Sequence, residues 1–251
     1  RRSDVQDHFD MHALMQDRLS LDRRFSYDVQ YDGPSRDTTL ELLASHFQRL
    51  ILRDLLGSSP DLLMVHAGVV SLGDRGVLIV AETAGGKSTL SLACTMQGMR
   101  FLGDDFALVD TARGVLRPFP RAVRLRRGAY ELVGDFSELI VGTTVDAGGE
   151  PRYYVHPERI RPDALGEAVQ LTDVILLAGF GDTPLCEPES KARAAMACAN
   201  ADCFSPKTAA MDLVWRWAEL ADRARCLRLR CGPPLETATY LMRLLESDGC
   251  D

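Results

Sequence analysis

One segment near residue 80 limits what this chain can fold into more than any other. From Val77 to Leu90 an apolar run is followed by small residues and then by Gly86-Lys87-Ser88. This pattern predicts a strand, a tight loop and a helix in immediate succession, which is the context of a phosphate-binding loop (P-loop). A chance Gly-Lys-Ser at the start of a helix is the alternative.

The chemistry of such a loop follows from its parts. Backbone N–H groups at the start of a helix form a concave nest for phosphate oxygens. Lys87 would place an ammonium group at the β- and γ-phosphates, and the Ser88 hydroxyl would ligate Mg²⁺. We therefore expect ATP with Mg²⁺ here, bound by Ala81, Glu82, Thr83, Ala84, Gly85, Gly86, Lys87, Ser88 and Thr89.

Two alanines depart from the usual composition of a P-loop. Ala81 replaces the first glycine of the motif, and Ala84 stands where many such loops have another glycine. A Cβ atom penalises positive φ, so we expect a negative φ at both positions.

Composition and charge narrow the classes of partner. The chain has 251 residues, 46% hydrophobic and 26% charged, enough for one large domain with a sizeable core. Its net charge of −7 does not favour nucleic acid, and no apolar run reaches the roughly 18 to 20 residues that span a bilayer. Seven cysteines without a recognisable signal peptide lead us to expect a cytoplasmic protein. A homo-oligomer is compatible with this composition.

Apolar periodicity divides the chain into an extension, residues 1–58 with an amphipathic helix at 37–56, and a main α/β domain, residues 59–251. In this domain we expect strands at 62–72, 76–80, 101–102, 106–109, 173–180 and 226–231. Helices are expected at 86–99, 128–139, 189–199, 206–224 and after Pro233-Pro234, with a loop at 143–150. Trp215 and Trp217 are predicted to pack in the core.

Asp104 and Asp105 follow an apolar strand fragment as adjacent carboxylates. On a strand they would point to opposite faces, so that one could face a metal-bound triphosphate while the other accepts a hydroxyl proton. A solvated pair of turn acids is the alternative. His66 lies within an expected apolar strand, where a lone histidine is more often a core residue than a functional one.

Basic residues gather over residues 117–127. Arg121, Arg124 and Arg126 alternate with apolar residues at roughly strand spacing, and Arg152 precedes two tyrosines. We interpret these arginines either as a solvated face or as a phosphate clamp or dock for an acidic peptide, because planar guanidinium groups suit such anions.

Three of these segments together resemble the catalytic domain of the HPr serine kinase/phosphorylase family. They are Val65-His66-Ala67-Gly68-Val69-Val70, the P-loop at residues 81–88, and Phe101-Leu102-Gly103-Asp104-Asp105. The resemblance covers roughly residues 60–127 and is greater to the family's smaller stand-alone relatives, including kinases that phosphorylate a serine of lasso peptides. It implies a P-loop domain of the HPr-kinase (phosphoenolpyruvate carboxykinase-like) type.

The resemblance also implies a role for each matched residue. His66 would lie near the nucleotide phosphates, and Lys87 and Ser88 would be the P-loop lysine and the Mg²⁺ ligand. Asp105 would be the general base toward the substrate serine, with Asp104 as its acidic, metal-binding neighbour. The chain has no counterpart of the family's glycine-rich E-I-R-G-L-G-type segment, so neither HPr as a substrate nor the reverse, phosphorylase reaction is expected.

Together these features predict an ATP- and Mg²⁺-dependent kinase that phosphorylates a serine of a peptide or small protein. A ribosomally made, lasso-type precursor is the leading candidate for the acceptor. One alternative is a nucleotide-binding regulatory or peptide-carrier module, which would need no carboxylate at Asp105 beside the γ-phosphate. The other is a small-molecule kinase on the same scaffold, which differs only in its substrate.

Overall fold

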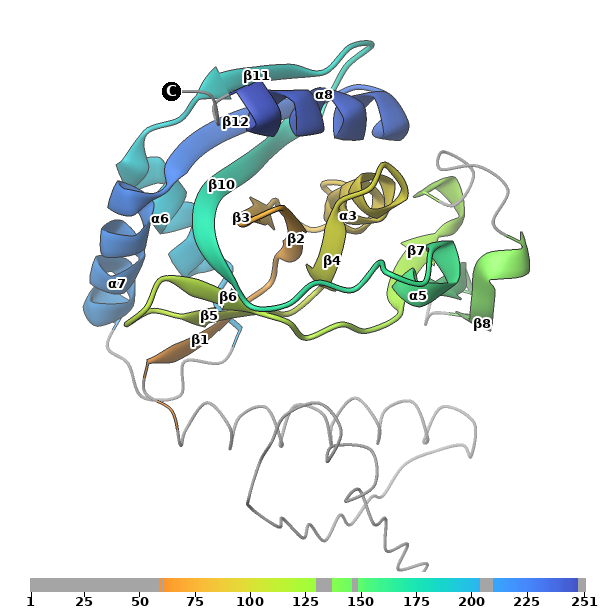
Figure 1. Ribbon diagram of the computed structural model, residues 1–251, viewed down its shortest axis with the longest axis horizontal. Coiled ribbons are helices and arrows are strands. Elements are labelled where there is room, and N and C mark those ends of the chain that lie inside the picture. Colours follow the sequence, from red (N-terminus) through yellow and green to blue (C-terminus); the bar gives the residue numbers. More distant parts are fainter. Residues whose placement is uncertain (1–58, 60, 130–136, 146–148, 204–209, 248–251) are drawn as a thin grey trace, which may run out of the picture. The chain divides into compact units, whose positions relative to one another are not determined.

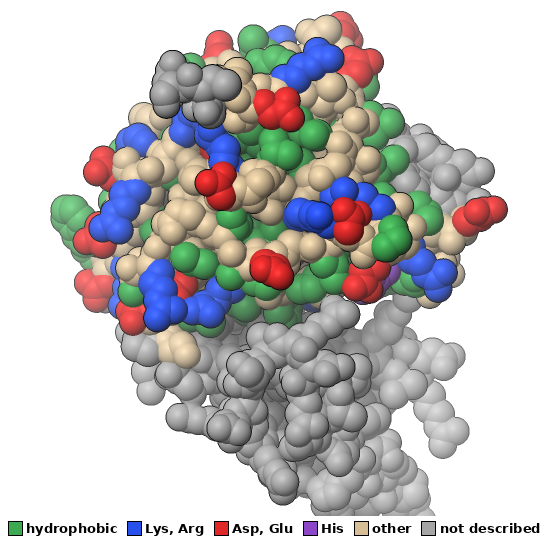
Figure 2. All heavy atoms as spheres, in the orientation of Figure 1, with side chains coloured by type: hydrophobic (Ala, Val, Ile, Leu, Met, Phe, Trp, Pro, Cys, Tyr) green, Lys and Arg blue, Asp and Glu red, His purple; other side chains and the backbone are tan. Residues whose placement is uncertain are grey.

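The computed structural model describes residues 59, 61–129, 137–145, 149–203 and 210–247. The expected N-terminal extension at 1–58, with its helix at 37–56, lies outside these residues. Within them, none of the helices combines the length and the apolar character that a bilayer crossing requires. On the face shown in Figure 2, basic and acidic side chains are interspersed.

A nine-stranded mixed sheet forms the core of the described chain (Figure 1). Its main path runs β1-β5-β6-β10-β3-β2-β4, while β12 pairs with β10 and β11 pairs with β12. The strands are β1 (Leu62–Val65), β2 (Gly68–Leu72), β3 (Arg75–Val80), β4 (Arg100–Gly103), β5 (Ala107–Asp110), β6 (Val115–Arg117), β10 (Val169–Phe180), β11 (Leu185–Pro188) and β12 (Arg225–Cys231). The main helices are α3 (Lys87–Met96), α6 (Lys191–Asn200), α7 (Ala210–Arg223) and α8 (Pro234–Ser247). The predicted α/β class is confirmed.

Strand β10 joins the two halves of this sheet. Its first residues, Val169 and Gln170, pair antiparallel with β6, and further along it runs parallel to β3 and β12. Figure 1 shows how strongly β10 curves between these partners. Because β3, β10 and β12 are parallel, their carboxyl ends meet at one edge of the sheet, where β3 leads into α3.

Strand β3 is buried on both faces, as its continuous apolar sequence predicts. Val77 and Ile79 belong to one core, with residues of α3 and α8. Leu78 and Val80 belong to a second core, with residues of α6 and α7. The two cores fix the position of β3, and therefore of the loop that follows it.

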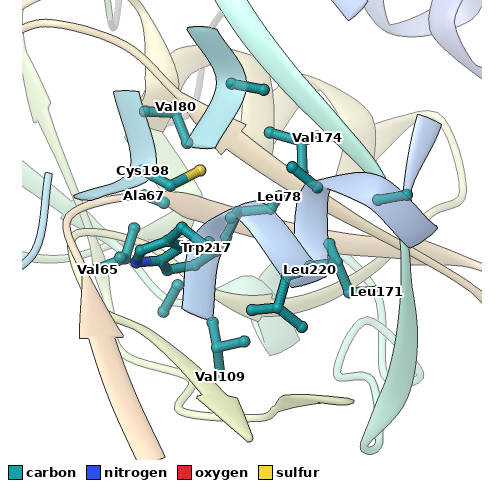
Figure 3. Close-up of a cluster of buried hydrophobic side chains, with 14 of the residues drawn as sticks. Val65, Ala67, Leu78, Val80, Val109, Leu171, Val174, Cys198, Trp217 and Leu220 are labelled. Atoms are coloured by element: carbon teal, nitrogen blue, oxygen red, sulfur yellow. The ribbon is translucent and has the colours of Figure 1, made fainter. Parts of the chain in front are cut away.

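The two tryptophans of α7 have different environments. Trp217 is fully buried in the second core, among the side chains shown in Figure 3. The prediction for Trp215 is wrong, because its side chain is 64% exposed. Two residues span more than half a turn of an α-helix, so Trp215 and Trp217 point to opposite sides of α7.

The strand expected at 62–72 is in fact two strands. Strand β1 pairs with β5, whereas β2 pairs with β3 and β4. The chain changes partners at His66-Ala67, where the His66 N–H donates to the carbonyl of Ala201 at 2.7 Å. His66 therefore lies at a break between strands, with 39% of its side chain exposed. Periodicity could not reveal this break because the apolar run continues on both sides.

A second, antiparallel sheet with the order β7-β9-β8 packs against α3. It contains β7 (Val123–Arg126), β8 (Ile140–Val145) and β9 (Pro151–Val155), and the short helix α5 (Pro157–Ile160) follows. The loop expected at 143–150 is wrong for residues 143–145, which pair with β9. Of the helix expected at 128–139, residues 128–129 are helical, Ser137–Leu139 is a 3-10 turn, and 130–136 lie outside the described residues.

A buried carboxylate holds three of the central strands in register. Asp173 of β10 is fully buried and forms ion pairs with Arg75 of β3 (3.1 Å) and Arg225 of β12 (2.6 Å). The Thr172 hydroxyl also donates to this carboxylate at 2.7 Å. Two guanidinium groups and a hydroxyl thus compensate for the burial of the charge.

Candidate active site

The loop between β3 and α3 requires glycine at two positions. A Cβ atom on Gly85 would lie 2.8 Å from the Cβ of Ala81. Gly86 has a φ of 93°, and a Cβ on it would lie 3.2 Å from the ring of Phe180. The backbone can therefore fold this tightly only without side chains here. Helix α3 then begins at Lys87, one residue after the predicted start.

The expectation of a negative φ at Ala84 is wrong. Ala84 has a φ of 63°, in the left-handed region, whereas Ala81 is not among the described non-glycine residues with positive φ. A left-handed conformation costs a residue with a Cβ about 1–2 kcal/mol. The turn as a whole imposes this conformation, so the local preference of alanine does not decide it.

The buried side chain of Lys87 forms hydrogen bonds with the backbone at the start of this loop. It is only 5% exposed, and its Nζ donates to the carbonyl oxygens of Ala81 (2.7 Å) and Glu82 (3.1 Å). Burial lowers the pKa of Lys87, and the charges of Asp104 and Asp105 partly oppose this shift. A phosphate anion in the loop would be a stronger acceptor for this ammonium group than two uncharged carbonyls.

Asp104 lies close to Ser88 and is only 4% exposed. Burial and the neighbouring Asp105 charge raise the pKa of Asp104 to about 7, although hydrogen bonds from the Ser88 side chain and the Asp105 backbone oppose the shift. The Oδ1 atom of Asp104 has no hydrogen-bond partner among the described residues. A bound cation would satisfy this oxygen and bring the pKa back down.

Ser88 and Asp104 therefore fit a Mg²⁺ site. In the described part of the chain, no group of three or more His, Cys, Asp or Glu side chains could hold a metal by itself. Mg²⁺ does not need such a cage, because it commonly takes one or two protein oxygens and completes its shell with water and substrate phosphates. The pair supplies a hydroxyl and a carboxylate next to the loop between β3 and α3.

Asp105 and Asp104 are separated by a bend in the backbone. Both residues follow β4 in this bend, not on a strand, and Asp105 has a φ of 65°. Aspartate is one of the few non-glycine residues that tolerate this region. The Asp105 side chain is 31% exposed and lines a cavity, whereas Asp104 does not line it. The left-handed residue, and not strand alternation, thus gives the two carboxylates different environments.

His66 contacts the backbone of Asp105. Its Nδ1 lies 3.0 Å from the Asp105 carbonyl oxygen and 3.9 Å from the carboxylate Oδ1. Because a carbonyl oxygen can only accept a hydrogen bond, Nδ1 carries the proton and donates it. His66 therefore stabilises the bend that presents Asp105.

One cavity of about 1000 Å³ connects these groups. Residues 83–89, at the end of the loop between β3 and α3 and the start of α3, line it together with His66 and Asp105. Ala81 and Glu82, which were also expected to contact the nucleotide, do not line it and instead provide the carbonyls that Lys87 binds. The other lining residues include an apolar wall, a basic wall and the acidic residue Asp182.

One wall of the cavity was not predicted from the sequence, and it is apolar except for the hydroxyl of Thr237. This apolar wall consists of Phe180, Cys231, Pro233, Pro234 and Thr237. These residues lie at the ends of β10 and β12 and at the start of α8. Phe180 is 66% exposed in spite of its apolar ring. The parallel arrangement of β3, β10 and β12 is the signal that would have found this wall, since parallel strands end at the same edge of a sheet.

The arginines of the basic stretch at 117–127 lie in different environments. Arg117 pairs with Asp110 at 2.6 Å, and Arg121 stacks over Phe106 with its Cζ 5.0 Å from the ring centroid. Burial lowers the pKa of Arg121, and the nearby Asp105 charge opposes this shift. Within this stretch, the described arginines that line the cavity are Arg124 and Arg126, and Arg152 of β9 joins them in the basic wall.

Comparisons with known proteins find similarity among solved structures. No protein-family model and no curated protein sequence matches this chain. Among solved structures, the chain is similar to the Hpr(Ser) kinase/phosphatase from Coxiella burnetii, with 17% identity and a TM-score of 0.36 over 74% of this chain and 93% of that one. At this level of similarity, the function has to be argued from the residues themselves.

Proposed function

We propose that this protein is an ATP- and Mg²⁺-dependent kinase that transfers the γ-phosphate to a serine hydroxyl of a peptide or small protein. The position of Asp105 carries this proposal, because its partly exposed carboxylate lines the same cavity as Lys87 and the P-loop. A module that only binds a nucleotide gains nothing from a carboxylate there, since it repels the triphosphate. A base for an acceptor hydroxyl needs such a position.

The nucleotide has a complementary surface on each side of the P-loop nest. Backbone N–H groups at the start of α3 and the ammonium group of Lys87 would bind the phosphates. The apolar wall would take the base, with the exposed ring of Phe180 as a face for stacking. Ser88 and Asp104 would hold Mg²⁺, which supplies charge neutralisation across the β- and γ-phosphates when it is bound.

Phosphate transfer then requires that the serine hydroxyl is positioned at the γ-phosphorus and that one base accepts its proton. Asp105 accepts the proton of the serine hydroxyl as that oxygen attacks the γ-phosphorus. The bond from the γ-phosphorus to the bridging oxygen breaks, and ADP leaves with the bridging oxygen on its β-phosphate. His66 keeps Asp105 in place through the backbone contact at 3.0 Å.

We propose a peptide as the acceptor class. The cavity of about 1000 Å³ lies at the upper end of the range of about 300–1000 Å³ that is typical of ligand pockets, which is compatible with an acceptor group beside the nucleotide. The resemblance to kinases of lasso peptides makes a ribosomally made precursor the first acceptor to test.

The substitution Asp105→Asn tests this proposal. Asparagine tolerates left-handed backbone as well as aspartate does, so the variant keeps the bend and loses the base. We expect single-turnover transfer to a serine peptide to fall about 10²–10⁴-fold. The Kd for ATP should stay the same or decrease, because one negative charge near the triphosphate is removed.

Lys87→Ala is the companion variant. It should weaken ATP binding and transfer together, since Lys87 is proposed to bind the phosphates in the ground state as well. Undiminished transfer by a folded Asp105→Asn variant would contradict the proposal. A wild-type protein that binds ATP but phosphorylates no acceptor would favour the regulatory module.

A further inference from the structure

We propose that the basic wall of Arg124, Arg126 and Arg152 binds acidic side chains of the peptide acceptor next to its serine. This inference rests on the proposed kinase function. It gives the acceptor a definite chemistry, a serine flanked by carboxylates, which the P-loop and Asp105 do not specify.

The sheet places the three guanidinium groups on one face. Arg124 and Arg126 are two residues apart on β7, so their side chains leave the same face of the strand. Val123 and Leu125 alternate with them and are buried in the core with α3, and Leu125 also lines the cavity. Arg126 lies directly opposite Arg152 in the register of β7 and β9. All three arginines line the cavity that contains Asp105 and the P-loop.

Arg124 and Arg126 gather two positive charges on one face of β7, which suits an anionic ligand. Arg124 and Arg126 are exposed, and neither forms a hydrogen bond or an ion pair with another described residue. Arg117, from the same stretch, has its own partner in Asp110 at 2.6 Å. The pair on β7 thus concentrates positive charge in a chain whose net charge is −7, and a ligand with carboxylates would neutralise it.

The hydrogen-bond donors that we propose for the nucleotide phosphates lie on other elements than the basic wall. The P-loop backbone and Lys87 lie at the start of α3, whereas the arginines come from a separate sheet that packs beside this helix. A guanidinium group can form two parallel hydrogen bonds with a carboxylate, which gives orientation as well as affinity. Acidic residues bound there would hold the acceptor in the cavity and bring its serine toward Asp105.

The experiment uses three synthetic peptides with one central serine, flanked on both sides by Asp, by Asn or by Lys. The full chain is compared with the double variant Arg124→Gln/Arg126→Gln. Arg243→Gln/Arg223→Gln is the control, because these two arginines are exposed and lie outside the cavity lining. Thermal melts of all variants establish that they are folded, and Arg126→Lys separates the effect of charge from that of the planar group.

We expect the wild type and the control to prefer the Asp peptide over the Asn peptide by about tenfold or more in kcat/KM, with the Lys peptide worst. The double variant should lose this preference through a higher KM, while its Kd for ATP, measured without peptide, stays within about twofold. The preference of Arg126→Lys for the Asp peptide should lie between that of the wild type and that of the double variant. Equal use of the Asp and Asn peptides by the wild type would overturn the inference. So would a double variant that loses ATP affinity, because the arginines would then contact the triphosphate.

The basic wall can be tested separately if the protein proves not to be a kinase. If the wild type transfers phosphate to none of the peptides, fluorescence anisotropy with labelled peptides and a nonhydrolysable ATP analogue still tests the basic wall. Binding of the Asp peptide that the double variant loses and the control keeps would support the wall without transfer. Absence of binding to the wild type would overturn it.

Discussion

The Nδ1 atom of His66 donates a hydrogen bond to the backbone carbonyl of Asp105 at 3.0 Å, while the Asp105 carboxylate Oδ1 lies 3.9 Å away. The carboxylate therefore has no need to serve as the partner of the ring, and its oxygens can receive an acceptor hydroxyl. The histidine acts on the backbone of a left-handed residue. This relationship makes His66 a positioning residue in the proposed reaction.

His66→Ala should lower kcat by about 10²-fold, the cost of a misplacement of about 1 Å at the reacting atoms. The KM for ATP should change little. His66→Asn should recover much of the activity, because its side-chain N–H can reach the same carbonyl. Steady-state kinetics of both variants checks this. A loss that is mainly in ATP affinity would instead indicate a direct contact of His66 with the phosphates.

Ala84→Gly should not destabilise the protein in spite of the greater flexibility of glycine. Relief of the left-handed alanine contributes about 1–2 kcal/mol, which offsets the entropic cost of glycine of about 0.5–1 kcal/mol. We expect a free energy of unfolding equal to that of the wild type or up to about 1 kcal/mol higher. Urea denaturation measures it. Ala84→Val is the matched opposite and should be destabilised, since a branched side chain tolerates this φ still less.

Asp104 should make the stability of the metal-free protein depend on pH. Its pKa is about 7 in the folded state, against an ordinary value of 3.8. Between these values the folded state holds a proton that the unfolded state has lost, so stability decreases as the pH rises through this window and levels off above it. The slope for one group approaches about 1.4 kcal/mol per pH unit.

Asp104→Asn removes this group with little change in shape. Denaturation in EDTA from pH 4 to pH 8 should give a variant that is less sensitive to pH and more stable than the wild type at pH 8. Parallel pH profiles for the two proteins would show that the Asp104 carboxyl titrates normally.

Asp173→Asn should be strongly destabilising. It leaves the guanidinium groups of Arg75 and Arg225 without their buried counter-charge, and such a change typically costs about 3–5 kcal/mol. Glu187→Gln is a suitable control, because it breaks an ion pair with Arg228 in which both side chains are largely exposed. Thermal melts should show a large decrease in Tm for Asp173→Asn and a value near that of the wild type for Glu187→Gln.

The sequence by itself determined the elements whose patterns are local. The strand before the loop at residues 81–86 and the strand now called β10 could be predicted because their sequences are almost continuously apolar. The helix that begins at Lys87 could be predicted from the strand–loop–helix pattern of residues 77–90. The requirement for glycine before Lys87 could be predicted because a backbone that turns this tightly has no room for side chains. The paired aspartates were singled out by their position after an apolar strand fragment and by the family resemblance.

The tertiary structure decided everything that depends on which strands become neighbours. It split the expected strand at His66, because β1 and β2 have different partners. It placed Phe180 and Pro233 beside the P-loop, because β10 and β12 run parallel to β3. It also selected Arg124 and Arg126 from a longer basic stretch and set Arg152 opposite Arg126. Strand pairing depends on residues far apart in the sequence, so the periodicity of apolar residues within one element cannot predict it.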